Sequence, residues 1–221
     1  MRLHRSNPRF PKEGLEFLRS LKRNNRRPWF QKRKEDYERF VKAPMIEFVM
    51  ALANDLPDEY VADPAKSVFR IYRDVRFSKN KAPYKTHAAA HFPPRGKGRG
   101  LGAGLYFHIA PTEVWIGGGL YMPTPQEALA VRTKIAEHPR AFESIVASPE
   151  FRKRFGKLEG EKLKRVPRGF PADHPAAEWL KHKQWIAGAE LKPEAALSPK
   201  FYETLLAHFN AALPLLRFLN S

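Results

Sequence analysis

The chain contains no cysteine, and this absence excludes disulfides, thiolate nucleophiles and zinc sites built on sulfur. It also lacks long apolar runs, since none approaches the roughly 20 residues that a membrane-spanning helix needs. The first residues, MRLHRSNPRFPKEG, have no apolar core of the kind found in signal peptides. We therefore expect a cytoplasmic protein with no membrane partner.

Familiar catalytic motifs are missing as well: the sequence has no HExxH, DxD or GxSxG. His87 and His91 would lie about 13 Å apart along one strand, beyond the reach of a single metal ion. We expect no metal site, and the sequence identifies no cofactor. Whether the protein is an enzyme stays open at this point.

Acidic residues are scarce relative to basic ones, with 23 Asp and Glu against 40 Lys and Arg, for a net charge of +17. Residues 1–100 hold 24 basic and 11 acidic side chains, a balance of +13. This asymmetry suggests an acidic partner such as nucleic acid, a nucleotide or a phosphorylated metabolite. Genomic base composition and solvated helix faces explain the same excess without a partner.

The segment from Val68 to Thr86, VFRIYRDVRFSKNKAPYKT, concentrates six cations, one carboxylate and two tyrosines in nineteen positions. Read as a strand from Val68 to Phe77, it places alternate side chains on opposite faces. The apolar face would hold Phe69, Ile71, Val75 and Phe77, and the polar face Arg70, Tyr72, Asp74 and Arg76. Arg73 interrupts the apolar face, where an arginine needs a partner because an unpaired buried charge is costly.

These side chains suit a phosphate or carboxylate ligand, because they offer guanidinium forks, ammonium groups and hydroxyls. The candidate ligand-binding residues are Arg70, Tyr72, Arg73, Arg76, Lys81, Tyr84 and Lys85. Asp74 is the candidate catalytic residue, either as a general base or as the group that orients the neighbouring arginines. Lysines that merely protect a sheet edge from aggregation are the alternative interpretation.

A glycine run, Gly117 to Gly119, precedes a helix start in which Thr124, Pro125 and Glu127 make a capping box. Gly118 and Gly119 are candidate ligand contacts, because glycine lets backbone amides approach a phosphate. The spacing matches neither GxGxxG nor GxxxxGK[ST]. Glycines that form a bulge, or that let an aromatic ring lie flat on the sheet, are the alternative.

Hydrophobic periodicity predicts a single α+β domain over residues 1–221, with helices covering an antiparallel sheet, a helical N-terminal segment and a C-terminal helix. Predicted helices are Gly14 to Arg23, one starting at Pro28, Pro44 to Leu56, Pro125 to Glu137, Pro139 to Ala147, Ala176 to His182, and one from Ser198. Predicted strands are Val68 to Phe77, His87 to Phe92, Leu105 to Ile109, Glu113 to Gly117, Glu161 to Val166, and Gln184 to Leu191. A basic, glycine-rich loop should separate His91 from Leu105.

Three blocks resemble the family of conserved hypothetical proteins known as domain of unknown function 2461: FLRSLKRNNRRPWFQKRKEDY, FRIYRDVRFSKNKAPYKT and GGGLYMP. The resemblance runs from end to end, and the chain departs from the family pattern at Asn80, where an aspartate is usual. It implies one α+β domain and no established activity.

We thus expect a basic pocket that binds an anionic ligand, namely a phosphorylated small molecule or a nucleotide, with turnover left open. The alternative is a nucleic-acid-binding protein in which cations of the first two helices and the basic loop contact phosphates. A third interpretation is an interaction module without a ligand.

Overall fold

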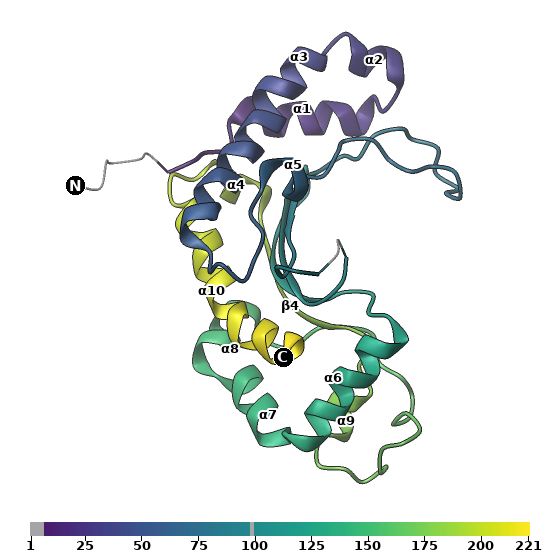
Figure 1. Ribbon diagram of the computed structural model, residues 1–221. Coiled ribbons are helices and arrows are strands. Elements are labelled where there is room, and N and C mark those ends of the chain that lie inside the picture. Colours follow the sequence, from purple (N-terminus) through teal and green to yellow (C-terminus); the bar gives the residue numbers. More distant parts are fainter. Residues whose placement is uncertain (1–6, 98–99) are drawn as a thin grey trace, which may run out of the picture. The chain divides into compact units, whose positions relative to one another are not determined.

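The computed structural model describes residues 7–97 and 100–221, and it has the predicted α+β architecture (Figure 1). Four strands form an antiparallel sheet in the order β1-β2-β3-β4, so that neighbours in the sequence are neighbours in the sheet. Their bounds are β1 (Ala88–Phe92), β2 (Gly104–Ile109), β3 (Val114–Leu120) and β4 (Trp185–Leu191).

The described chain divides into two compact units. Unit 1 contains residues 7–92, 106–116 and 190–206, and unit 2 contains residues 93–97, 100–105, 117–189 and 207–221. The helices of unit 1 are α1 (Lys12–Arg23), α2 (Arg27–Gln31), α3 (Lys34–Tyr37), the π-helix η1 (Glu38–Lys42), α4 (Ala43–Asp55), α5 (Pro64–Ser67) and the 3-10 helix η2 (Pro193–Leu197). Those of unit 2 are α6 (Pro125–Glu137), α7 (Pro139–Ala147), α8 (Pro149–Phe155) and α9 (Ala177–Leu180), while α10 (Phe201–Asn220) begins in unit 1 and ends in unit 2. A single domain over 1–221 stays a prediction.

The core of unit 1 lies against one face of the sheet. Phe48 of α4 contacts the rings of Phe107 and Phe201 at centroid distances of 5.9 and 5.5 Å, and all three are fully buried. In the part of β2 that belongs to unit 1, Phe107 and Ile109 are buried on this face, whereas Tyr106 and His108 are half-buried. The period of two therefore gives β2 one core face and one polar face.

The helix predicted from Pro28 is broken into α2, α3 and η1, and it runs on into α4 without a loop. Pro44 explains why the π-helical turn η1 precedes α4, because proline has no N–H to donate to the carbonyl of Phe40 four residues earlier. Gly14 of α1 packs closely at that carbonyl, where a Cβ atom would overlap the oxygen. The wider π turn thus lets α1 approach the backbone of η1.

The predicted strand from Val68 to Phe77 is wrong. Only isolated bridges form, Val68 to Ala90 and Tyr72 to Tyr84, and residues 76–77 make a turn. The segment from Arg70 to Lys85, hereafter the arm, is an extended ribbon folded back on itself and held by hydrogen bonds from the Arg73 N–H to the Pro83 carbonyl and from the Lys85 N–H to the Ile71 carbonyl (Figure 1). Six cations in one segment oppose a regular strand within a sheet, since like charges repel across it.

Other predictions fare unevenly. Helices α6 and α7 have the predicted bounds, and the capping box of Thr124 and Glu127 is confirmed. The strand predicted from Glu161 to Val166 is wrong, because only an isolated bridge from Lys162 to His182 forms there. Helices α5 and α8 were not predicted. The basic loop before Leu105 includes residues 98–99, which lie outside the described residues.

Two contacts attach the arm to the N-terminal helices. The buried ring of Tyr84 stacks on Phe30 of α2 at 4.1 Å. The Asn25 side chain accepts a hydrogen bond from the Tyr84 N–H at 3.1 Å and donates one to the Tyr84 carbonyl at 2.9 Å. One amide side chain thus satisfies both backbone polar groups of a buried residue, which would otherwise lose hydration without compensation.

We expect Asn25→Ala to lower the free energy of unfolding by about 1 to 3 kcal/mol, because it leaves the Tyr84 N–H and carbonyl unpaired. Urea denaturation followed by circular dichroism measures the change. Asn54→Ala is the matched control, since Asn54 is exposed and makes a single hydrogen bond to the Met50 carbonyl. Equal losses in the two variants would contradict the role given to Asn25.

Candidate functional site

Asp74 and Arg76 form a bidentate ion pair on the arm. The Arg76 Nε donates to Oδ1 of Asp74 at 3.0 Å and its Nη2 donates to Oδ2 at 2.7 Å. The pair lies on the exposed surface rather than inside a cleft, with the Arg76 side chain 76% accessible and that of Asp74 48%. Hydrogen bonds from Arg76 lower the pKa of Asp74 to about 2. A carboxylate this acidic is a weak base, so the geometry favours the orienting role over general base catalysis.

The other candidate cations are spread along the arm. Arg73 is half-buried and donates to the Ser78 hydroxyl at 3.4 Å, and Lys81 donates to the Val75 carbonyl at 3.1 Å. Arg70 is exposed, and its positive charge is near enough to contribute to the lowered pKa of Asp74. Lys85 is half-buried, with its Nζ 4.7 Å from the ring centroid of Phe69.

The aromatic residues of the arm divide into buried and exposed ones. Tyr84 is 1% exposed and belongs to the core, so it anchors the arm to the core and is not accessible to a ligand. Tyr72 is 48% exposed, and Phe77, predicted on the apolar face, is 95% exposed. Phe77 is exposed, contrary to the prediction, because the turn at residues 76–77 interrupts the alternation of a strand.

Gly118 and Gly119 lie on β3 within unit 2, where close packing accounts for both. A Cβ atom on Gly118 would lie 2.8 Å from the Gly104 carbonyl oxygen. One on Gly119, whose φ is 148°, would overlap the carbonyl of Trp185. These contacts favour the structural interpretation of the glycines, in which they permit neighbouring backbones to approach. A role in ligand binding stays a prediction.

An open groove of about 450 Å³ lies among α1, α2, α3 and η1. Its walls include the carboxylates of Glu13, Glu16 and Asp36, and the guanidinium of Arg33 lies 4.6 Å above the ring of Trp29. Three carboxylates in one groove disfavour an anion, so this groove is not the predicted basic pocket.

Sequence reasoning missed a group of polar side chains on the second face of the sheet in unit 1. The Tyr106 hydroxyl lies 3.1 Å from Nδ1 of His108, and Nε2 of His108 lies 3.4 Å from a carboxylate oxygen of Glu113. The ring of His87 is 5.2 Å from that of His108. We call Tyr106, His108 and Glu113 the polar chain.

A signal for the polar chain exists in the sequence. Alternation in Leu105-Tyr106-Phe107-His108-Ile109 places Tyr106 and His108 together on the face opposite the buried residues. The Ala110 N–H donates to the Glu113 carbonyl and closes the turn that brings Glu113 back beside His108. Glu113 is a partner across the hairpin, so it does not belong to any pair of residues along one strand.

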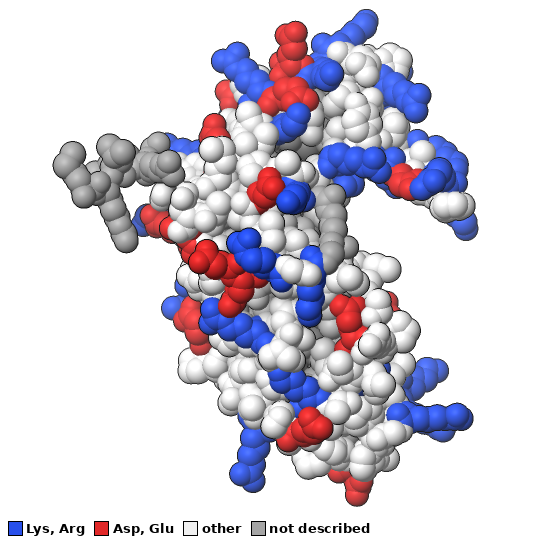
Figure 2. Space-filling model, in the orientation of Figure 1, with Lys and Arg blue, Asp and Glu red and all other residues white. Residues whose placement is uncertain are grey.

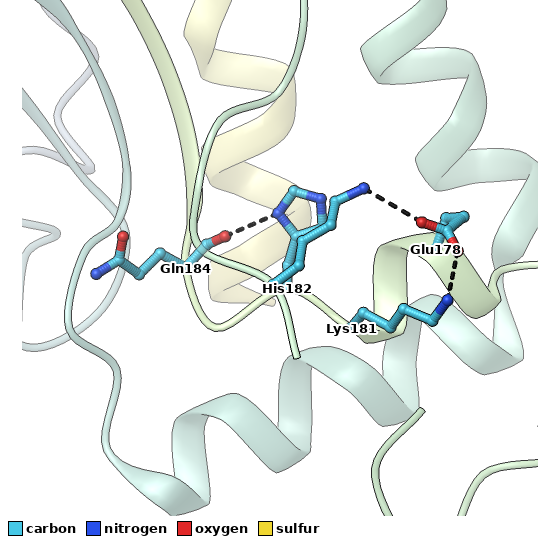
Figure 3. A network of polar contacts seen from close by, with 5 residues as sticks. Glu178, Lys181, His182 and Gln184 are labelled. Carbon is cyan, nitrogen blue, oxygen red and sulfur yellow. Dashed lines mark hydrogen bonds and ion pairs between the residues drawn. The ribbon is translucent and has the colours of Figure 1, made fainter. Parts of the chain in front are cut away.

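Unit 2 has a polar network around α9 (Figure 3). Glu178 accepts from Lys181 at 2.6 Å and from Lys162 at 3.4 Å, and the buried His182 ring lies 3.1 Å from the Gln184 carbonyl. The carboxylate is exposed and its cations neutralise it. This arrangement ties α9 to the chain around Lys162, and we interpret it as structural.

In the ranges 7–97 and 100–221, no helix has the length and apolar character needed to cross a bilayer. Within those same ranges, no three histidine or acidic side chains gather as metal ligands would.

The fold and the arm define the class: an α+β protein with a meander sheet and a projecting basic ribbon. The model of the conserved hypothetical protein family, domain of unknown function 2461, matches residues 13–218, and the chain belongs to that family. No curated protein and no solved structure matches the chain. Function is therefore argued from the residues.

Three buried or half-buried histidines make stability depend on pH. Burial, then the charges of His108 and Lys85, lower the pKa of His87 to about 4, and burial lowers the pKa of His108 and His182. A histidine whose folded pKa is depressed stabilises the fold fully above its unfolded pKa of about 6.5. We expect the free energy of unfolding to fall as pH drops from about 6.5 to 4, with His87 contributing about 2 to 3 kcal/mol.

Urea unfolding at several pH values tests this expectation. His87→Asn should flatten the dependence between pH 6.5 and 4, and His138→Asn, at an exposed position, is the control for replacing a histidine by asparagine. Identical pH profiles for wild type and His87→Asn would exclude His87 as a contributor.

Proposed function

We propose that the protein binds a polyanion through the arm, and that single-stranded nucleic acid is the class of ligand that fits it best. The observation that carries the proposal is the form of the arm: an exposed ribbon with six cations, one carboxylate and two accessible aromatic rings. This form favours nucleic acid over a small ligand held in a pocket, and it assigns the phosphate contacts to the arm instead of the first two helices and the basic loop.

The charge of the arm supports a polyanion. The one carboxylate, Asp74, offsets Arg76, which leaves a balance of +5 from six cations. Arg73 and Lys81 donate to a hydroxyl and a carbonyl oxygen, and these neutral partners do not offset their positive charges. Figure 2 shows blue side chains along the projecting ribbon with little red among them. Exposed cations bind a polyanion by releasing its condensed counterions, which requires no cleft.

The exposed rings support single strands over duplexes. Phe77 has 95% of its surface accessible, and the guanidinium of Arg76 lies 5.7 Å from its ring centroid. Unpaired bases stack on such rings, at about 1 to 3 kcal/mol per base, and arginine adds a cation–π contribution. Tyr72, 48% exposed, offers a second ring on the same ribbon.

A phosphorylated small molecule is the second candidate, and one observation favours it. Lys85 is half-buried at the base of the arm, close enough to His87 for its charge to lower the pKa of that ring. A site where positive charge is partly shielded from water attracts an anion more strongly than an exposed one.

We expect binding to a fluorescent single-stranded oligonucleotide to weaken linearly with log salt, with a slope of about −4 if all six cations contact phosphates. The variant Arg70→Gln, Lys79→Gln, Lys81→Gln should reduce the slope to about −2, because three phosphate contacts are lost. Fluorescence anisotropy between 50 and 300 mM salt measures both slopes.

The matched control removes three exposed cations of unit 2: Arg152→Gln, Lys153→Gln, Lys157→Gln. It should keep the wild-type slope. Equal effects of the two triple variants would mean that the net charge, and not the arm, attracts the strand. A wild-type slope shallower than about −1 would favour the small anion instead.

Phe77→Ala should weaken binding of the oligonucleotide by about 1 to 3 kcal/mol through lost stacking, yet leave binding of heparin unchanged. The melting temperature should not change, because the ring is 95% exposed. Met50→Ala, at a 58% exposed position of α4, is the control for removing an accessible apolar side chain. Equal loss for both polyanions would contradict stacking on Phe77.

A further inference from the structure

The polar chain has the order of groups found in proton-transfer sites: a hydroxyl, a histidine and a carboxylate. Glu113 accepts hydrogen bonds from the Thr112 hydroxyl and from His108, and these interactions lower its pKa, so it is ionised and can only accept. Nε2 of His108 therefore carries the proton that faces Glu113. Its Nδ1 is then an acceptor, to which the Tyr106 hydroxyl donates.

The surroundings keep His108 ready to accept a proton at neutral pH. Its side chain is 19% accessible, and burial is the largest cause of its lowered pKa. Glu113 opposes this effect, because the carboxylate would stabilise an imidazolium ion. Two further charged groups act on the polar chain: Glu190 raises the pKa of His108, and Lys22 lowers that of Glu113. His87 faces His108, whose charge lowers the pKa of His87, and Lys85 acts on His87 in the same direction.

Two aromatic rings lie beside Tyr106 and offer apolar surface to a ligand. The ring of Phe69 lies edge to face with that of Tyr106 at a centroid distance of 6.1 Å, and the ring centroid of Trp115 lies 5.7 Å from that of Tyr106. Lys85 lies over the ring of Phe69. The half-buried Tyr106 thus has two apolar rings beside its own, and one of them, Phe69, carries a cation over its face.

We propose that Tyr106, His108 and Glu113 form an acid–base site in which the Tyr106 hydroxyl meets a small anionic substrate with an aromatic or other planar apolar part. Phe69 and Trp115 would contact the apolar part, and Lys85 would attract the negative group. Lys85 belongs to the arm, but Tyr106, His108 and Glu113 lie outside it, and the acid–base site does not depend on binding of nucleic acid.

The proton transfer balances without a further reactant. A bond from hydrogen to carbon or oxygen in the substrate breaks, and that proton bonds to Oη of Tyr106. The phenolic proton moves at the same time to Nδ1 of His108, and the electron pair stays on the substrate as its conjugate base. His108 becomes an imidazolium ion paired with Glu113, and the reverse sequence returns a proton to the substrate.

The test uses the reactivity of Tyr106 toward two aryl sulfonyl fluorides, the anion 4-(fluorosulfonyl)benzoate and the neutral 4-methylbenzenesulfonyl fluoride. In the labelling step Oη bonds to sulfur, fluoride leaves, and the phenolic proton passes to His108. Mass spectrometry of peptides measures the rate at each tyrosine. Tyr121 is the internal reference, since it is 64% exposed and Tyr106 is only half-buried.

We expect the anionic reagent to label Tyr106 at least about tenfold faster than Tyr121, since a positioned base contributes about 10²-fold or more. Because burial lowers the pKa of His108, the rate at Tyr106 should level off with the titration of His108, at a lower pH than an ordinary histidine would give, whereas an ordinary tyrosine reacts faster up to about pH 10. Glu113→Gln and His108→Gln should each remove the excess rate. Lys85→Gln should remove the preference for the anionic reagent at Tyr106, and Lys200→Gln should not.

Labelling that follows exposure alone, with Tyr106 slower than Tyr121 in the wild type, would overturn the proposal. So would a rate at Tyr106 that survives both His108→Gln and Glu113→Gln in variants whose circular dichroism shows a native fold. If those variants do not fold, the wild-type ratio and its pH profile decide the matter.

Discussion

The stack of Tyr84 on Phe30, with Asn25 bonded to both backbone polar groups of Tyr84, is the contact on which the candidate site depends. Residues 25 and 30 belong to the N-terminal helical region, and residue 84 belongs to the arm. An exposed ribbon with six cations has little apolar area of its own to bury, so it cannot hold a shape unaided. The buried ring and the doubly bonded asparagine fix the end of the arm and leave its cations accessible.

The two faces of β2 have different roles, because one packs into the core and the other carries polar side chains. Phe107 and its neighbours bury one face against Phe48 and Phe201, which stabilises the sheet. Tyr106 and His108 occupy the other face, where polar atoms can stay hydrogen-bonded and partly accessible. Because the backbone of a packed strand is rigid, the distances within the polar chain are set by the core on the opposite side.

Local chemistry decided which elements could be predicted. The capping box and the proline at the start of α6 lie within four residues of each other and specify where that helix begins. Val68 to Phe77 alternates like a strand, yet charge repulsion and the turn at residues 76–77 leave only isolated bridges. The pairing of His108 with Glu113 crosses a hairpin, and it could be found only by joining strand alternation to turn geometry.

The two proposed sites differ in how accessible their side chains are, and therefore in the kind of ligand that each can bind. A small molecule needs partly shielded groups, because hydrogen bonds and charges act more strongly where water is excluded. The side chains of His108 and Glu113, 19% and 30% accessible, meet that condition. A polyanion gains its affinity from many exposed contacts and the release of counterions, so the 76% accessible Arg76 suits it without any cleft. The predicted basic residues and the unpredicted polar chain therefore call for ligands of different size, although Lys85 lies close to both.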